Sequence, residues 1–144
     1  MNMSGTDDIP NDIARQIEAS LSGMDRAVQE VVTQLDGRLS VYRDGVPERT
    51  IVGRINEKFF CKLGISPVLR QAEVEWRRDN YEFWLMAHVW TDDNNARRSW
   101  VKKIAVMSDV PTEYAKARAL LQSALRAVEQ VKETDLKPAK EIRL

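Results

Sequence analysis

Hydrophobic and polar positions alternate along residues 81–90 in a way that organises the rest of the chain. Side chains of a strand point in turn to the two faces of a sheet. One face here would carry Phe83, Leu85, Ala87 and Val89, and the other would carry Trp84, Met86, His88 and Trp90. An ordinary half-buried antiparallel strand is hydrophobic on one face only. This pattern therefore predicts a strand whose two faces are both covered or used for binding.

The residues before this strand predict its hairpin partner. Residues 70–78 also alternate, and the following Asp79 and Asn80 tolerate the positive φ that two-residue hairpin turns require. Such a turn would pair hydrophobic residues on one face: Trp76 with Phe83, Val74 with Leu85, and Ala72 with Ala87. A slip of one residue would destroy this match. We therefore expect a hairpin between 70–78 and 81–90.

Hydrophobic residues at helical spacing predict a long helix at each end of the chain. The first series is Ile13, Ile17, Leu21, Met24, Val28, Val31 and Leu35, and the last is Ala117, Leu121, Ala124, Val128 and Val131. The first helix should run from about residue 9 to 36 and end at Gly37. Gly23 lies inside it at a cost of about 1 kcal/mol relative to alanine, and marks either a close crossing or a weak point.

Short hydrophobic stretches predict further strands at 39–43, 49–54, 58–63 and 100–107. The run Gly64 to Pro67 is expected to end the third of these. The register of the last strand stays open, because either Trp100, Ile104 and Val106 or Val101, Ala105 and Met107 could face the core. The fold class is α+β: a long N-terminal helix, an antiparallel five- or six-stranded meander sheet and a long C-terminal helix, in the order α-β-β-β-β-β-β-α.

Composition places the chain among ordinary globular proteins. Its 144 residues are enough for one domain, which we expect at 9–135, between a disordered N-terminus at 1–8 and a frayed charged tail at 136–144. The formal net charge is zero, which argues against a general polyanion binder. One cysteine cannot form an internal disulfide, and no signal peptide or membrane-length hydrophobic run is visible. We expect a cytoplasmic protein that does not associate with membranes.

Candidate chemistry is sparse. Cys61 and His88 are single residues of their types, and their spacing does not indicate a nucleophile with its base. Cys61 follows two phenylalanines and is expected to be a small buried hydrophobic residue. The sequence has no glycine-rich phosphate loop and too few metal ligands for a structural zinc site. We therefore expect no catalytic residues, no metal, no cofactor and no enzymatic activity.

The surface around the central strands is the best functional candidate. Tryptophan and arginine are typical anchors of protein interfaces. Our main hypothesis is a non-enzymatic protein-interaction protein of the adaptor, chaperone, inhibitor or regulator type, which forms a homodimer and binds another protein. The predicted partner-binding residues are Trp84, Met86, His88, Trp90 and Trp100. The helix seams are the alternative surface for the same contacts.

Two other functions stay open. The first is a nucleic-acid-binding regulator, because aromatic side chains interleaved with cations suit single-stranded nucleic acid. Its residues would be Arg77, Arg78, Arg97, Arg98, Lys102 and Lys103. The second is a small-molecule binder or enzyme with a pocket between sheet and helices, near His88. Against all of these stands the plain interpretation that the tryptophans belong to the core and the arginines to solvated turns.

Overall fold

A computed structural model describes residues 9–91, 98–107 and 109–138, without the side chains of 98–107 and 137–138. Its helices are α1 (Asn11–Ser22), α2 (Asp25–Leu35) and α3 (Tyr114–Glu129), followed by a 3-10 turn at Glu133–Asp135. Its strands are β1 (Arg38–Arg43), β2 (Val46–Arg54), β3 (Phe59–Leu69), β4 (Tyr81–Thr91), β5 (Arg98–Met107) and β6 (Lys137–Pro138). The fold is α+β, as predicted.

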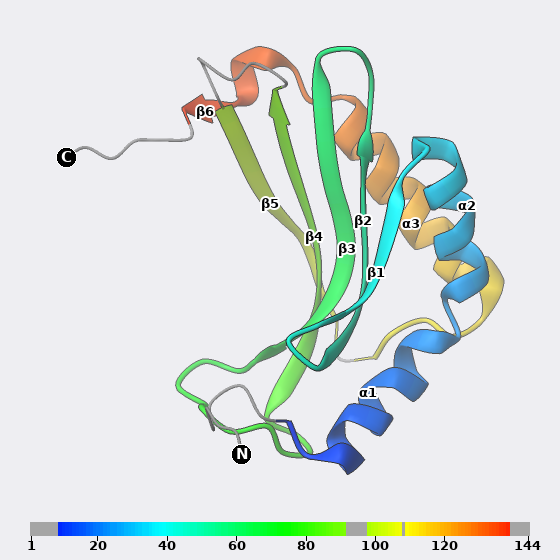
Figure 1. Ribbon diagram of the computed structural model, residues 1–144, viewed down its shortest axis with the longest axis vertical. Helices are drawn as coiled ribbons and strands as arrows, with labels where there is room; N and C mark the ends of the chain where they lie inside the picture. The colour runs from blue at the N-terminus through cyan, green and yellow to red at the C-terminus, as the bar shows by residue number, and fades with distance from the viewer. Residues whose placement is uncertain (1–8, 92–97, 108, 139–144) are drawn as a thin grey trace.

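The strands form one antiparallel sheet in which each strand pairs with its neighbour in sequence, in the order β1-β2-β3-β4-β5-β6. The sheet is curved, and α1, α2 and α3 all lie against its convex face (Figure 1). The two N-terminal helices pack mainly on β2, and α3 packs on α2, β3 and β4. The opposite, concave face is not covered by any described helix.

The core lies between the helices and the convex face. Both helical seams point inward: Ile17, Leu21, Val31 and Val128, for example, are at most 1% exposed. On β4 the predicted alternation is confirmed. Phe83, Leu85, Ala87 and Val89 are buried, whereas Trp84, Met86, His88 and Trp90 on the other face are only partly buried. The helix seams are thus used within the monomer, and the second face of β4 is the one left open.

The prediction of one N-terminal helix from 9 to 36 is wrong, because the helix is broken at Gly23 and Met24. A Cβ atom on Gly23 would lie 2.8 Å from Cβ of Thr112, closer than such atoms approach in proteins. Gly23 therefore marks a close crossing as well as a break. The break allows α1 and α2 to follow a curved sheet, and the hydrophobic seam continues through the buried Met24.

The predicted hairpin between 70–78 and 81–90 is also wrong. β3 does not end at Gly64 but continues to Leu69, and it is β3 that pairs with β4 along its whole length, from Phe59↔Thr91 to Leu69↔Tyr81. Proline is tolerated at position 67 because β2 pairs with β3 only as far as Arg49↔Ile65. Beyond that point no described strand pairs with β3 on its β2 side, so a missing backbone N–H breaks no ladder there.

Residues 70–80 form a loop instead of a strand. The backbone N–H of Arg70 donates to the carbonyl of Asn80 at 2.9 Å, and the Asn80 side chain donates to Glu73 at 3.0 Å. Asp79 has φ of 72°, so the positive φ expected there is present. Val74, predicted to face the core, is 72% exposed. Of the two residues predicted to form the hairpin turn, Asp79 has positive φ and Asn80 does not, and the strand before them does not exist.

At the other edge, the register of β5 shifts between Leu85 and Met86 on its partner strand. The backbone of Trp100 pairs with Val89, and that of Val101 with His88. Leu136 is buried, and Lys137 and Pro138 pair with β5. The predicted disorder at 1–8 and most of the predicted tail lie outside the described residues. Within the described part of the chain, no helix is both long enough and hydrophobic enough to cross a bilayer.

Candidate functional site

The candidate site is the concave face of the sheet, opposite the helices. β3 and β4 contribute partly buried side chains to it, among them Phe60, Lys62, Trp84, Met86 and His88. β2 contributes Glu48 and Thr50, which are at most 5% exposed although no described helix lies over them. A surface of this kind combines aromatic, charged and hydroxyl groups in one hollow.

Two adjoining cavities open on this face. The larger has a volume of about 350 Å³, the smaller about 190 Å³, and both are lined by Arg43, Ser66 and Met86. The larger one lies where β2 and β3 separate beyond the Arg49↔Ile65 pair. Ligand pockets in proteins start at about 300 Å³, so of these two cavities the larger one reaches that size.

Glu48 provides the most unusual group in the larger cavity. Its side chain is 6% exposed, and its carboxylate accepts hydrogen bonds from Ser40 Oγ at 3.0 Å and from Ser66 Oγ at 3.2 Å. The Nε atom of Arg43 lies 3.8 Å from the same carboxylate. These bonds join β1, β2 and β3 where the backbone ladder between β2 and β3 has ended. A buried charge is costly unless it is paired, so its position on an open face calls for an explanation.

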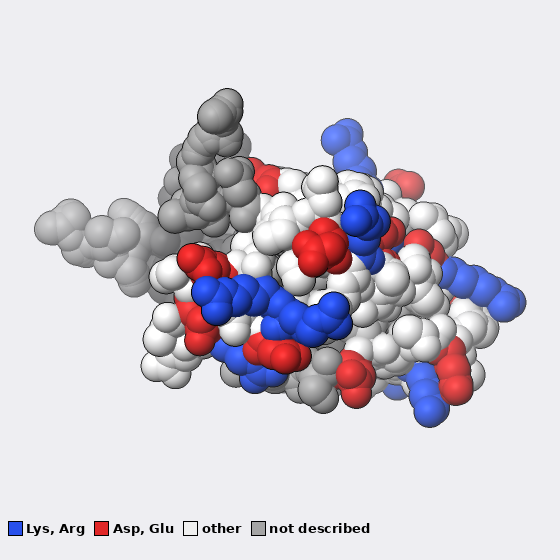
Figure 2. Space-filling model, turned by 90° about the horizontal axis from the view of Figure 1, so that it is seen from below, with Lys and Arg blue, Asp and Glu red and all other residues white. Residues whose placement is uncertain are grey.

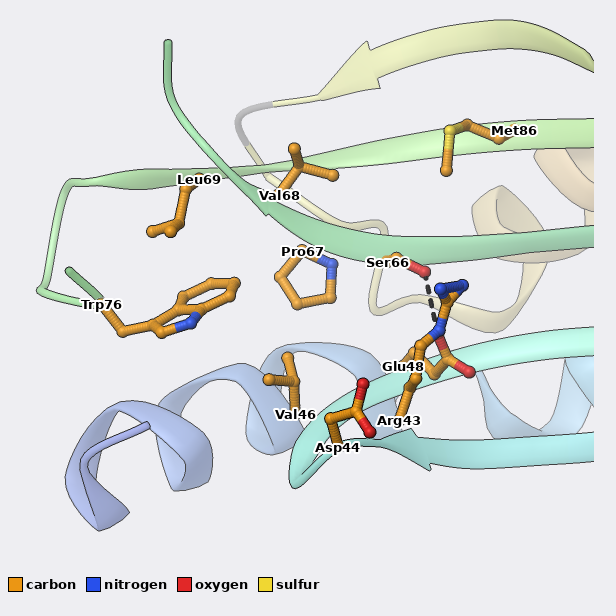
Figure 3. A pocket seen from close by; sticks show the side chains of 10 residues that line it. All are labelled: Arg43, Asp44, Val46, Glu48, Ser66, Pro67, Val68, Leu69, Trp76 and Met86. Atoms are coloured by element: carbon orange, nitrogen blue, oxygen red, sulfur yellow. Dashed lines mark hydrogen bonds and ion pairs between the residues drawn. The ribbon is translucent and has the colours of Figure 1, made fainter. Parts of the chain in front are cut away.

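The larger cavity has a polar and a hydrophobic end (Figure 3). Glu48, Ser66 and Arg43 gather at one end, and Trp76, Val46 and Leu69 at the other. Trp76 comes from the 70–80 loop and packs against Tyr81 with ring centroids 5.9 Å apart. The loop that replaced the predicted strand therefore supplies one wall of the cavity.

The smaller cavity lies beside His88, together with Lys62, Thr50 and Gly64. Burial and the nearby Lys62 ammonium lower the pKa of His88, which favours the neutral imidazole. Its Nε2 atom is enclosed and has no hydrogen-bond partner in the described part of the chain. His88 lies on the face opposite the helices. The cavity beside it is therefore not in the predicted place, between sheet and helices.

An aromatic row crosses the same face toward the other end of the strands. The Arg54 guanidinium lies 4.0 Å above the ring of Phe60, and Phe60 stacks on Trp90 at 5.9 Å. His88 in turn contacts Trp90 edge-on at 5.3 Å. These contacts fix the predicted residues His88 and Trp90 in one rigid group.

The predicted partner-binding residues are brought together only in part. Trp84, Met86, His88 and Trp90 share the concave face. Trp84 donates from its indole nitrogen to Glu82 at 2.7 Å. The backbone register groups Trp100 with Val89 of the covered face, and its side chain is not described.

The residues proposed for nucleic-acid binding do not form one surface in the described structure. Arg77 and Arg78 belong to the loop before Tyr81, and Arg77 is paired with Glu75 at 2.8 Å. Arg98 begins β5 beside the opposite end of β4. Arg97 and the side chains of Lys102 and Lys103 lie outside the described structure. On the side that holds α1 and this loop, acidic and basic side chains are interspersed (Figure 2).

Cys61 does not belong to the concave face. It is fully buried on the convex face, and burial raises the pKa of its thiol to about 11. It pairs with Val89, and His88 points to the other face. The described residues contain no cluster of three or more potential metal ligands.

Sequence reasoning missed the polar cluster around Glu48. Glu48 falls between the predicted strands 39–43 and 49–54, and Ser66 lies in the run expected to end the third strand, so the pattern does not predict that the two meet on one face. The signal available in the sequence was weak: an acid and a base, Glu48 and Arg49, adjacent within a hydrophobic stretch. Comparisons with protein-family models, curated proteins and solved structures found no match to this chain.

Proposed function

We propose that the protein is a non-enzymatic protein-interaction protein that binds its partner on the concave face of the sheet. The observation that carries this proposal is that helices cover one face of the sheet and leave the other open. The three described helices cover the convex face (Figure 1), whereas the concave face presents partly exposed aromatic side chains and two adjoining cavities. Aromatic groups around a hollow are typical of interface anchors.

Catalysis has less support from the same geometry. A nucleophile needs a base within hydrogen-bond reach. Ser66 pairs with Trp84, and His88 pairs with Lys62, so the two side chains lie four residues apart along the strands, or about 13 Å. This separation favours binding over a Ser–His mechanism.

We also propose that a second copy of the chain is one of the partners. A dimer would bury aromatic surface that the monomer leaves partly exposed. Light scattering after size exclusion would then give about twice the chain mass of 16.5 kDa. Met86→Glu should reduce that mass to the monomer value, whereas Val74→Glu, a matched change at an exposed loop residue, should leave it unchanged. A monomer mass for the native chain would contradict the dimer.

The test for a partner is site-specific photo-crosslinking in the native host. A benzophenone amino acid would replace Met86 on the concave face or Lys116 on α3, whose side chain is 73% exposed. We expect a discrete protein adduct from position 86 that is absent from position 116. Adducts from neither position, or the same adducts from both, would contradict binding on the concave face.

A second candidate function is small-molecule binding in the cavity beside His88. The enclosed Nε2 atom without a described partner favours it. Nuclear magnetic resonance of the single imidazole would detect a bound metabolite as a change in chemical shift when the protein is purified from its host and then unfolded and refolded. An unchanged resonance would count against this alternative.

A further inference from the structure

The carboxylate of Glu48 is buried but poorly neutralised, and this is the starting point for identifying what binds in the larger cavity. Two serine hydroxyls donate to it, but hydroxyls carry no charge. Among the described residues, the one cation within ion-pair distance is Arg43, with its Nε atom 3.8 Å away and its side chain 57% exposed. At this distance, and with the arginine largely in solvent, the pair contributes little neutralisation.

The same strand shows what a satisfied buried charge looks like in this protein. Arg49 is bonded to Glu18 and to Asp25, each at 2.6 Å, and its side chain is 3% exposed. Glu48 is almost as buried, with its side chain 6% exposed, but among the described residues no cation is bonded to it as closely. The cavity gives an external cation access to this carboxylate.

The rest of the cavity lining fits such a cation. Asp44, a second acid, stands on the same wall as Glu48 and Arg43. The other end is formed by Val46, Leu69 and the Trp76 ring (Figure 3). A hydrophobic wall with an aromatic ring accommodates the aliphatic stem of a long basic side chain.

We infer that the larger cavity receives an arginine side chain of the protein partner, with Glu48 as its counter-ion and Trp76 beside its stem. This inference rests on the proposed function and names the chemistry by which the partner is recognised. Arginine fits better than lysine because its planar guanidinium donates two parallel hydrogen bonds to one carboxylate. On binding, Arg43 swings away toward solvent, where most of its side chain already lies.

The test uses three capped amino acids as probes on isotope-labelled protein: N-acetyl-arginine amide, N-acetyl-citrulline amide and N-acetyl-glutamate amide. Citrulline has nearly the shape of arginine without its charge. We expect saturable shifts of the Ser66 amide and the Trp76 indole with the arginine probe. Citrulline should bind at least about tenfold more weakly, the ratio expected for losing a charge-assisted hydrogen bond. The glutamate probe should not shift these resonances.

Two variants assign the charge to its residue. Glu48→Gln should reduce binding of the arginine probe to the citrulline level, whereas Glu57→Gln, the same change at an exposed turn residue, should leave it unchanged. Equal affinity of the native chain for arginine and citrulline would overturn the inference without any variant. So would preferred binding of glutamate, which would make Arg43 the recognition group, or the absence of shifts at Ser66 and Trp76.

Failure of this inference and failure of the proposed function have different signatures. If the probes do not bind but position 86 still yields a specific protein adduct, the concave face binds a partner by other chemistry. If the probes bind and position 86 yields no adduct, the cavity takes free cationic molecules, and the proposed protein partner is wrong. Both outcomes contradict an arginine anchor supplied by a partner protein.

Discussion

Glu48 and Arg49 are neighbours in sequence, almost equally buried, and opposite in surroundings. Arg49 points into the helix layer, where the carboxylates of Glu18 on α1 and Asp25 on α2 hold it at 2.6 Å each. Glu48 points to the concave face, where it meets two serine hydroxyls, a distant arginine and a cavity. The Arg49 charge is paired by side chains of the protein itself, whereas the Glu48 charge lies at a cavity that a molecule from solvent can enter.

We interpret the burial of Arg49 as structural and the burial of Glu48 as functional. The Arg49 cluster lies over the joint between α1 and α2, so its bonds fix two helices that Gly23 would otherwise leave loosely connected. The Glu48 cluster joins strands where their backbone ladder has ended, and it leaves a void. Substitutions on the two faces should therefore have unequal effects on stability.

The largest expected difference is between Leu85 and Met86 on β4. Leu85 is fully buried on the convex face, and Leu85→Ala should lower the free energy of unfolding by about 3 kcal/mol. Met86 is partly exposed on the concave face, and Met86→Ala should cost less than about 1 kcal/mol. Urea unfolding followed by circular dichroism measures both. Similar losses would mean that the concave face is part of the folding core.

A smaller difference is expected between Arg49 and Glu48. Arg49→Met should cost about 2 kcal/mol, below the 3–5 kcal/mol typical of breaking fully buried pairs, because Glu18 and Asp25 are 37% and 49% exposed. Glu48→Gln keeps the shape and one of the two acceptor oxygens, and its NH2 group can donate to the serine hydroxyl that bonded the other oxygen, so stability should change by less than about 1 kcal/mol. If Glu48→Gln proves the more damaging substitution, Glu48 is a structural residue.

The smallest effect concerns the dependence of stability on pH. Burial lowers the pKa of His88 below its ordinary value of 6.5, so the unfolded chain binds a proton more readily than the folded one. Stability should fall as the pH drops below 6.5 toward the folded pKa, and should not depend on this residue above 6.5. Unfolding of the native chain and of His88→Gln between pH 7.5 and about 5 isolates this contribution. A rise in stability on acidification, relative to the variant, would contradict the sign.

The elements that were predicted correctly are those whose hydrophobic pattern follows directly from which side chains are buried. The helical seams and the alternation along β4 reflect which side chains reach the core, and the structure places them as expected. The break at Gly23 was only partly foreseen, because the seam runs through it without a change of phase. The approach of Thr112, almost ninety residues away, explains why position 23 is a glycine, and local spacing does not contain that contact.

The prediction of a hairpin between 70–78 and 81–90 failed for a physical reason that lies in the tertiary structure. Ala72, Val74 and Trp76 alternate as a strand would, and Pro67 is typical of a strand end. However, Pro67 costs no hydrogen bond where β2 has separated from β3, so β3 pairs with β4 instead. The same separation leaves room for the cavity, and the register of the last pair, Arg49↔Ile65, places the next residues, Glu48 and Ser66, opposite each other. The site could therefore not be predicted without the correct pairing of β3 with β4.

The meander topology has a consequence for how the chain folds during synthesis. Each described strand pairs with a strand that is its neighbour in sequence. The sheet from β1 to β5 can therefore grow from hairpins of low contact order, a property associated with rapid folding, whereas β6 is separated from β5 by α3. The helix that completes the core, α3, is translated after the five long strands. Until it emerges from the ribosome, Leu63, Leu85 and Val89 lack part of their cover. Nascent chains that end before residue 114 should therefore be the form most prone to aggregation.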